Sequence, residues 1–171
     1  MRDVPDDAEL PSLVGAARRG DQTAWDALVV RFTPLVWAVA RGHGLPATAA
    51  ADVAHTTWLR LVESLDVAPA DGIGEWVAAI ARSESVSALR WVDPRPDRRS
   101  GPPDPVWAAV GLLPARCRLA LRVLAITPPP DDNELAAALD TSPTEARSFA
   151  TECLERLAAA LAPTVPETTT A

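Results

Sequence analysis

Proline placement is the strongest constraint on how this chain can fold. Residues 93–105 contain five prolines and few apolar side chains. Proline lacks a backbone N–H and holds the residue before it in an extended conformation, so this stretch continues neither a helix nor a strand ladder. We interpret it as a flexible linker with local extended character. It separates two blocks, residues 8–92 and 106–161, and residues 162–171 form a Pro/Thr-rich tail that we expect to be disordered.

Apolar residues in the first block recur at helical spacing. The spacing predicts helices over residues 10–17, from 21 through at least 32, over 49–65 and over 76–91. Asp21 and Thr48 have the chemistry of N-caps, and Gly20 that of a C-cap. Pro34 either begins a further turn or kinks the second helix, whose apolar stripe continues to Ala40. We therefore expect a domain of four helices.

Prolines and short polar side chains mark the helix ends in the second block. They predict a short helix near residues 106–113, a second that begins at Pro114, a third capped by Asp131 or Asp132, and a fourth over about 143–161. The apolar face of the fourth helix consists of Ala146, Ala150, Leu154, Leu157 and Leu161. A short helix, a tight turn and a longer helix outline a helix-turn-helix unit. The sequence thus predicts an all-α fold with two small helical domains.

Composition and charge narrow the function classes. No apolar run reaches the roughly 18 residues of a membrane helix, and the acidic N-terminus lacks the apolar core of a secretory signal. We therefore expect a cytoplasmic protein without membrane insertion. The net charge is −7, with eight Arg against twelve acids in residues 1–92 and five against eight in residues 107–171. A DNA-binding surface is normally basic, so this balance disfavours strong independent DNA binding, although local arginines can act inside a larger basic assembly.

The chain offers little that predicts a catalytic or metal site. Cys117 and Cys153 are too few and too far apart in sequence for a disulfide framework or a zinc knuckle, and we interpret them as small apolar residues on helix faces. Asp52 and His55 share one helix face, but no third ligand accompanies them. The sequence contains no recognisable nucleophile–base pair, and the glycines at 72 and 74 are too few for a phosphate loop. We therefore expect neither an enzyme nor a cofactor.

Four short motifs, in this order and at this spacing, resemble the extracytoplasmic-function group of bacterial RNA polymerase sigma factors. The motifs are Arg19-Gly20-Asp21 followed by Ala24-Trp25, Asp52-Val53 leading to Trp58-Leu59-Arg60-Leu61, Trp76-Val77-Ala78-Ala79-Ile80-Ala81-Arg82, and Leu113-Pro114-Ala115-Arg116-Cys117-Arg118. Each motif is weak alone, but their collinearity over residues 10–161 is specific. The resemblance implies a sigma region 2-like four-helix domain over residues 8–92, a linker over 93–105, and a region 4-like helix-turn-helix domain over 106–161.

The resemblance implies a polymerase-binding helix. In the family, the helix that matches residues 49–65 docks on the clamp coiled coil of the largest polymerase subunit. Asp52 is then expected to pair with clamp arginines, and the other polymerase-binding candidates are His55, Trp58 and Arg60. His55 stands where the family commonly has glutamine, and Ala49 stands where an acid is common, so one pairing is lost. The alternative interpretation of these charges is an ordinary solvated helix face.

The resemblance also implies two DNA-binding segments. The loop at 66–75 and the helix after it match the part that opens the minus-ten promoter element and holds a flipped base. The DNA-binding candidates there are Arg82, Ser83, Ser87 and Arg90. Glu84 adds repulsion towards phosphate. Trp76 and Trp91 can stack on bases, but core positions are the favoured interpretation, as they are for Ile80 and Leu89.

The last helix matches the family's recognition helix, which reads the major groove. Its candidates are Thr144, Glu145, Arg147, Ser148 and Thr151. Glu145 can accept a hydrogen bond from cytosine but repels phosphate, and Phe149 and Glu152 occupy positions where the family often carries arginine. The alternative is a structural helix, or a face on which another protein binds.

Three classes of function remain, in descending order of support. The first is a sigma factor that binds core RNA polymerase and promoter DNA and directs transcription initiation. Most members of the family are restrained by an anti-sigma factor, which is a further expected partner. The second is a sigma-like regulatory protein that has lost promoter reading and acts by protein–protein interaction with polymerase or a regulator. Asp52, Trp58 and Arg82 favour the first, and the acidic balance favours the second. An enzyme is the least supported class.

Overall fold

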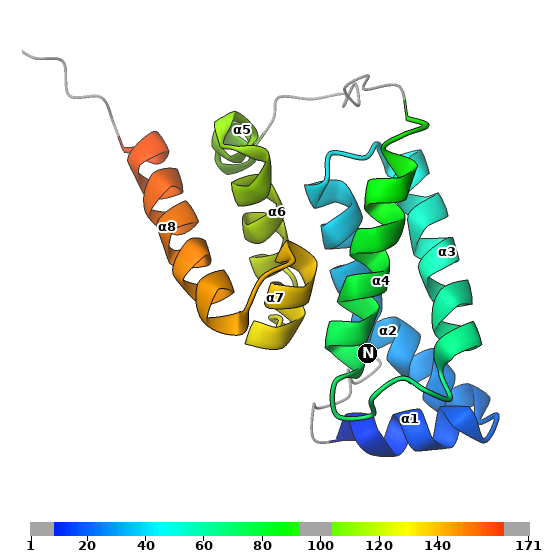
Figure 1. Ribbon diagram of the computed structural model, residues 1–171. Helices are drawn as coiled ribbons and strands as arrows, with labels where there is room; N and C mark the ends of the chain where they lie inside the picture. The colour runs from blue at the N-terminus through cyan, green and yellow to red at the C-terminus, as the bar shows by residue number, and fades with distance from the viewer. Residues whose placement is uncertain (1–8, 93–103, 163–171) are drawn as a thin grey trace, which may run out of the picture.

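The computed structural model describes residues 9–92 and 104–162, which form eight α-helices (Figure 1). Their bounds are α1 Leu10–Arg18, α2 Gln22–Gly42, α3 Ala47–Ser64, α4 Ile73–Ala88, α5 Pro105–Leu112, α6 Ala115–Leu124, α7 Asp132–Leu139 and α8 Pro143–Leu161. No strand occurs within these two ranges. The expected all-α class is therefore confirmed. The linker from 93 to 103 and the tail from 163 onward lie outside the described residues.

The first half of the chain, α1–α4, follows the predicted helix order with corrections at the ends. Asp21 caps α2 by accepting hydrogen bonds from the backbone N–H groups of residues 23 and 24. Pro34 lies inside α2, which continues as one helix. Thr48 is not a cap: α3 begins at residue 47, after Pro46, whose fixed backbone angle suits the residue that precedes a helix. The fourth helix begins at Ile73, three residues earlier than expected, directly after Gly72.

Capping residues define the turn between α7 and α8 in the second half. Asp131 and Glu134 form a capping box at the start of α7, and Ser142 and Glu145 form another at the start of α8. Between them, Asp140 adopts the left-handed conformation with φ of 57°, which a short polar side chain tolerates. Because these capping residues are close to the helix ends in sequence, the positions of α7 and α8 could be predicted from the sequence.

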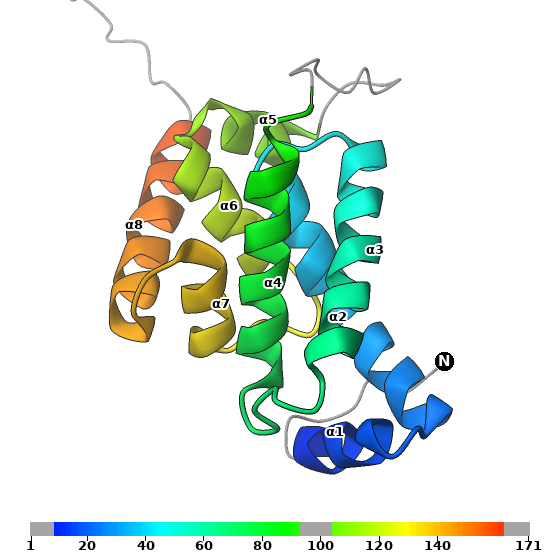
Figure 2. The ribbon, with the colours of Figure 1, turned by 45° about the vertical axis from the view of Figure 1, so that its right-hand side comes forward.

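One buried core joins the two halves. The main cluster of buried side chains includes Val39 and Val77 from the first half and Leu119, Val123 and Leu139 from the second. α7 packs along α4 and α6 along α2, as the two views in Figures 1 and 2 show. Among the described helices, α2 alone is long and apolar enough to cross a membrane, but half of its apolar window is buried inside this core.

Several expected core residues lie on the surface. Leu89 and Trp91 follow the end of α4, and Trp91 is 88% exposed. Trp76 and Ile80 are half-buried against the core, as expected. On α8, Leu154 and Leu161 are exposed, because the inward-facing positions of that helix are Ala146, Ala150 and Cys153.

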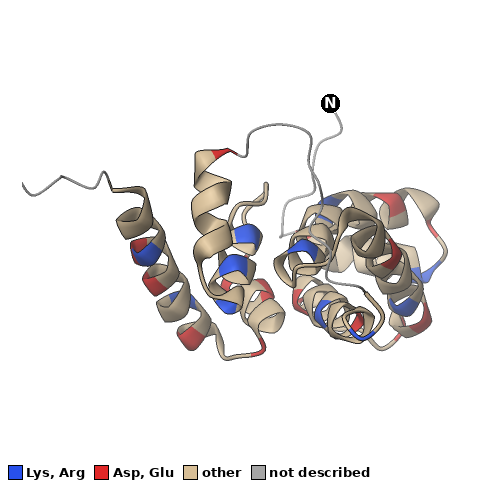
Figure 3. Ribbon diagram, turned by 90° about the horizontal axis from the view of Figure 1, so that it is seen from above, with Lys and Arg blue, Asp and Glu red and all other residues tan. Residues whose placement is uncertain are grey.

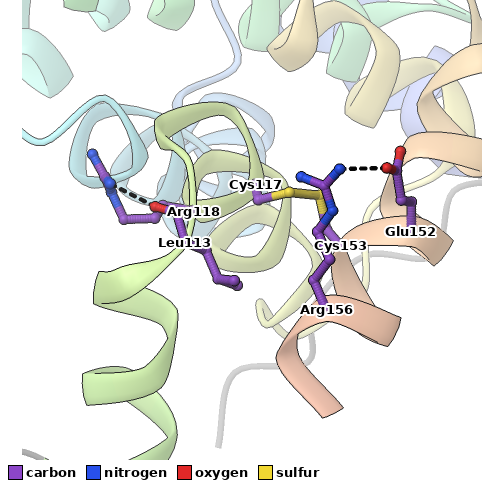
Figure 4. Close-up of a disulfide and its surroundings, with 6 residues drawn as sticks. All are labelled: Leu113, Cys117, Arg118, Glu152, Cys153 and Arg156. Atoms are coloured by element: carbon purple, nitrogen blue, oxygen red, sulfur yellow. Dashed lines mark hydrogen bonds and ion pairs between the residues drawn. A yellow bond between two sulfur atoms is a disulfide. The ribbon is translucent and has the colours of Figure 1, made fainter. Parts of the chain in front are cut away.

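The interpretation of the cysteines as separate apolar residues is wrong. Cys117 of α6 and Cys153 of α8 form a disulfide, and both side chains are fully buried (Figure 4). They lie 36 residues apart in sequence, but α7 and its turns fold back and place α8 beside α6. The disulfide lies in a small apolar cluster with Val110 and Leu121, which fastens α8 to α5 and α6.

Candidate functional site

α3 presents a continuous exposed surface on the outside of the first half. Asp52, His55, Leu59 and Val62 are exposed and recur at three- and four-residue spacing, so they share one side of the helix. We call this set the α3 face. Leu59 is 52% and Val62 is 57% exposed. Within the described part of the chain, no side chain pairs with the Asp52 carboxylate. The α3 face thus combines an available acid with two uncovered apolar side chains.

The other two polymerase-binding candidates are engaged within the chain. Trp58 packs edge-on against Trp25 of α2, with ring centroids 6.3 Å apart, and so helps to fix α3 on α2. Arg60 pairs with Glu63 at 3.2 Å and with Glu84 of α4 at 3.7 Å. Asp52 and His55 therefore face outward, whereas Trp58 and Arg60 contact other residues of the first half.

The α4 candidates divide between two sides of the helix. Ser83 and Ser87 are exposed at i and i+4 on one face of α4, and Arg90 is exposed just after the helix ends. Arg82 points towards the second half, where its guanidinium pairs with Asp140 at 3.1 Å. A groove of about 350 Å³ between α3 and α4 is lined in part by Ser83 and Trp76. The structure thus places Ser83 and Ser87 on one exposed face of α4 and Arg82 at the contact between the halves.

The α8 candidates are all exposed in the first turns of that helix. They are Thr144, Glu145, Arg147, Ser148 and Thr151. The Glu145 carboxylate accepts hydrogen bonds from the Thr141 and Ser142 hydroxyls and the Ser142 backbone, which lower its pKa to about 2. Arg147 pairs with Asp132 of α7. Glu145 therefore acts as an ionised cap, and Arg147 is partly neutralised.

Charges of both signs occur throughout the described residues. Basic and acidic positions are interspersed along both halves in Figure 3. Sequence reasoning missed four residues that matter here. Leu59 and Val62 are apolar residues that lie outside the buried stripe of α3, so they belong to its outer surface. Their spacing in the sequence was enough to predict this position. Asp132 pairs with Arg147 and Asp140 pairs with Arg82, and no local sequence pattern predicts either contact.

His43 lies at the C-cap of α2, and its Nε2 atom is buried with no hydrogen-bond partner among the described residues. Burial lowers the pKa of its imidazole, and the positive charge of Arg82 lowers the pKa further. The folded protein therefore resists protonation that the unfolded chain accepts.

We accordingly expect the free energy of unfolding to fall as the pH drops below 6.5, the ordinary pKa of histidine, and to gain nothing from this group above it. Urea denaturation between about pH 7.5 and 5.5 measures this dependence. His43→Gln should flatten the profile. Parallel profiles for wild type and His43→Gln would contradict the assignment.

No family model matches the chain, and no curated protein matches it. Among solved structures, the chain is similar to CnrH in its complex with the cytosolic domain of CnrY, with a TM-score of 0.66 and 21% sequence identity. The match covers 91% of this chain and 97% of CnrH, so it includes both halves. At this identity the likeness shows that the two proteins share a fold. The chain therefore shares the all-α fold of CnrH.

Proposed function

We propose that this protein is an extracytoplasmic-function sigma factor, a non-catalytic subunit that joins core RNA polymerase and directs it to specific promoters in the cytoplasm. CnrH, whose fold it shares over both halves, is such a sigma factor. The observation that carries the proposal is the α3 face, on which Asp52 is exposed and makes no ion pair within the described ranges. The four collinear motifs of the sequence agree with this assignment.

In this proposal the α3 face binds the polymerase clamp. Asp52 supplies a carboxylate for a clamp arginine, and Leu59 and Val62 supply apolar area that association can bury. A protein interface commonly combines an apolar centre with a charged rim. DNA binding belongs to residues 8–92 through the exposed α4 residues and to residues 106–161, a helix-turn-helix domain, through the first turns of α8.

An anti-sigma factor is the second protein partner that we propose. The matched CnrH structure is a complex with CnrY, an anti-sigma factor. Since the likeness extends over both halves, a regulator that binds the same arrangement would fit this chain.

The competing function is a sigma-like regulator that binds polymerase without reading promoters. The pairing of Arg147 with Asp132 and of Arg82 with Asp140 favours it, because both arginines already have an acidic partner within the chain. Run-off transcription with core polymerase and a genomic promoter library separates the two functions. Discrete start sites support the sigma factor, and polymerase binding without any start site supports the regulator.

Asp52→Ala should weaken binding to core polymerase about fivefold, which corresponds to roughly 1 kcal/mol for the loss of one partly exposed ion pair. Biolayer interferometry with immobilised core enzyme measures the change. Asp26→Ala on α2 removes an exposed carboxylate of the same kind outside the α3 face and should leave the affinity unchanged. Equal affinities for wild type and Asp52→Ala would show that the α3 face does not bind the clamp.

A further inference from the structure

A cavity of about 270 Å³ is lined by residues of α2, α5 and α6. Four residues of α2 line it at i, i+3, i+4 and i+7, so they share one side of that helix: Pro34, Trp37, Ala38 and Arg41. A proline inside a helix removes a backbone hydrogen bond and costs stability, yet α2 carries Pro34 at this position. The α2 wall of the cavity is therefore apolar and aromatic, with one cation at its end.

The other wall combines an aromatic ring with a second cation. Trp107 of α5 and Arg122 of α6 both line the cavity, and the Arg122 guanidinium lies over the Trp107 ring, 4.8 Å from its centroid. This cation–π contact holds the indole and the positive charge together. Ala125, which ends α6, contributes only a methyl group to the wall. Two tryptophans and two arginines thus line one small cavity.

Both tryptophans are incompletely covered by the protein. Trp37 and Trp107 are each 39% exposed, whereas Trp25 and Trp58 pack against each other in the first half. A tryptophan side chain has a large apolar area that contributes strongly when it is buried. Two half-covered indoles in one concave site therefore favour a ligand that covers them.

The cavity is basic, although the protein as a whole is acidic. The net charge of the chain is −7, but the described residues that line the cavity include Arg41 and Arg122 and no acid. Arg41 donates a hydrogen bond to the Leu45 backbone carbonyl, which helps to fix its side chain and leaves its positive charge in place. Guanidinium groups bind carboxylate and phosphate oxygens well, because their N–H donors are planar and parallel. The charge of the cavity therefore favours an anion.

We propose that this cavity binds a small planar aromatic anion, whose ring contacts Trp37 and Trp107 and whose carboxylate or phosphate contacts Arg41 and Arg122. The cavity is slightly smaller than the range of about 300–1,000 Å³ in which drug-sized ligands bind, so we expect a ligand of one or two fused rings. None of the lining residues belongs to the α3 face or to the exposed candidates of α4 and α8. Ligand binding here therefore does not depend on the proposed function.

Isothermal titration calorimetry of the full chain with 2-naphthoate tests the site. We expect saturable binding with a dissociation constant of about 0.1 mM, which agrees with the binding energy per atom of small ligands. The neutral 2-naphthol lacks the carboxylate, and cyclohexanecarboxylate lacks the aromatic ring, so each should bind about tenfold more weakly. Adenosine monophosphate carries a phosphate in place of the carboxylate. Tighter binding of this nucleotide than of 2-naphthoate would support the site and assign the anion to a phosphate, and weaker binding would assign it to a carboxylate.

Two variants separate the site from non-specific binding. Ala125→Leu fills the cavity from an exposed position and retains all four aromatic and basic side chains, so it should abolish binding and leave the circular dichroism spectrum unchanged. Arg122→Gln should weaken binding of 2-naphthoate about tenfold and leave the affinity for 2-naphthol unchanged, because only the anion uses the guanidinium. Arg19→Gln removes an exposed arginine that does not line the cavity and is the matched control.

Trp37→Ala tests the aromatic contact. It should weaken binding of both 2-naphthoate and 2-naphthol, whereas Trp91→Ala, which removes an exposed tryptophan that does not line the cavity, should affect neither. Equal affinities for wild type and Ala125→Leu would overturn the proposal, as would equal affinities for 2-naphthoate and 2-naphthol. Failure of both 2-naphthoate and adenosine monophosphate to bind the wild-type protein would overturn it as well.

Discussion

Glu134→Ala should lower the free energy of unfolding by about 3–5 kcal/mol, the usual cost of removing one partner from a buried ion pair. The Arg31 guanidinium, 2% exposed, would remain in the core without this carboxylate. The substitution also removes the capping box at the start of α7, because the Glu134 side chain accepts a hydrogen bond from the Asp131 backbone N–H. Urea denaturation monitored by circular dichroism measures the loss.

Three further variants separate the causes. Glu134→Gln retains a side-chain oxygen for the capping box and removes the charge, so it isolates the ion pair. Adding Arg31→Met removes the second buried charge and should recover much of the stability, since a pair of buried charges is often replaceable by apolar groups. Asp132→Asn weakens the exposed pair with Arg147 and should cost less than about 1 kcal/mol. A loss for Glu134→Ala no larger than that of Asp132→Asn would contradict the role given to the buried pair.

Helix positions were predictable because their signals are local. Apolar spacing and helix-end residues together located the eight described helices. Asp21, Asp131 and Ser142 cap helices through atoms only two or three residues away. The predicted start of α3 was wrong because a second local signal outweighed the first. Thr48 resembles an N-cap but follows Pro46, which already places the chain for α3.

The contact between the halves was not predictable, because each of its parts depends on residues distant in sequence. Gly42 looks like a helix end, and its close approach to Leu119 exists only after α6 has packed on α2. Glu134 looks like an ordinary capping residue, and nothing nearby shows that Arg31 will meet it. Two predicted helical domains thus gave no information about how they pack together.

The candidate site was predictable to the level of helix faces. The family resemblance implied Asp52, His55, Ser83 and Ser87, and each of them lies at an exposed position. It could not separate Arg82 from Ser83, because neighbouring residues on a helix point about 100° apart and the second half covers only one of these directions. The acid with which Arg82 pairs is fixed by tertiary packing, so the sequence near Arg82 does not predict it.

Removing the disulfide is the second change with a large expected effect. Replacing Cys117 and Cys153 together by alanine should lower the free energy of unfolding by about 4 kcal/mol, because a bridge that closes a loop of this length strongly restricts the unfolded chain. The sequence separation is 36 residues. α8 is especially dependent on the bridge, since Ala146, Ala150 and Cys153 are its only buried residues.

The effect should be specific to the bridge and to α8. Reducing agent should destabilise the wild-type protein by a similar amount and leave the double-alanine variant unchanged. Hydrogen exchange should then accelerate most in α8, which the disulfide joins to α6 (Figure 4) inside a small apolar cluster. It should accelerate least in α2 and α3, which belong to the larger core. Two thiols that react with iodoacetamide in native protein purified without reductant would show that the bridge does not form. Equal acceleration in all helices would instead show that the two halves unfold as one cooperative unit, as their shared core allows.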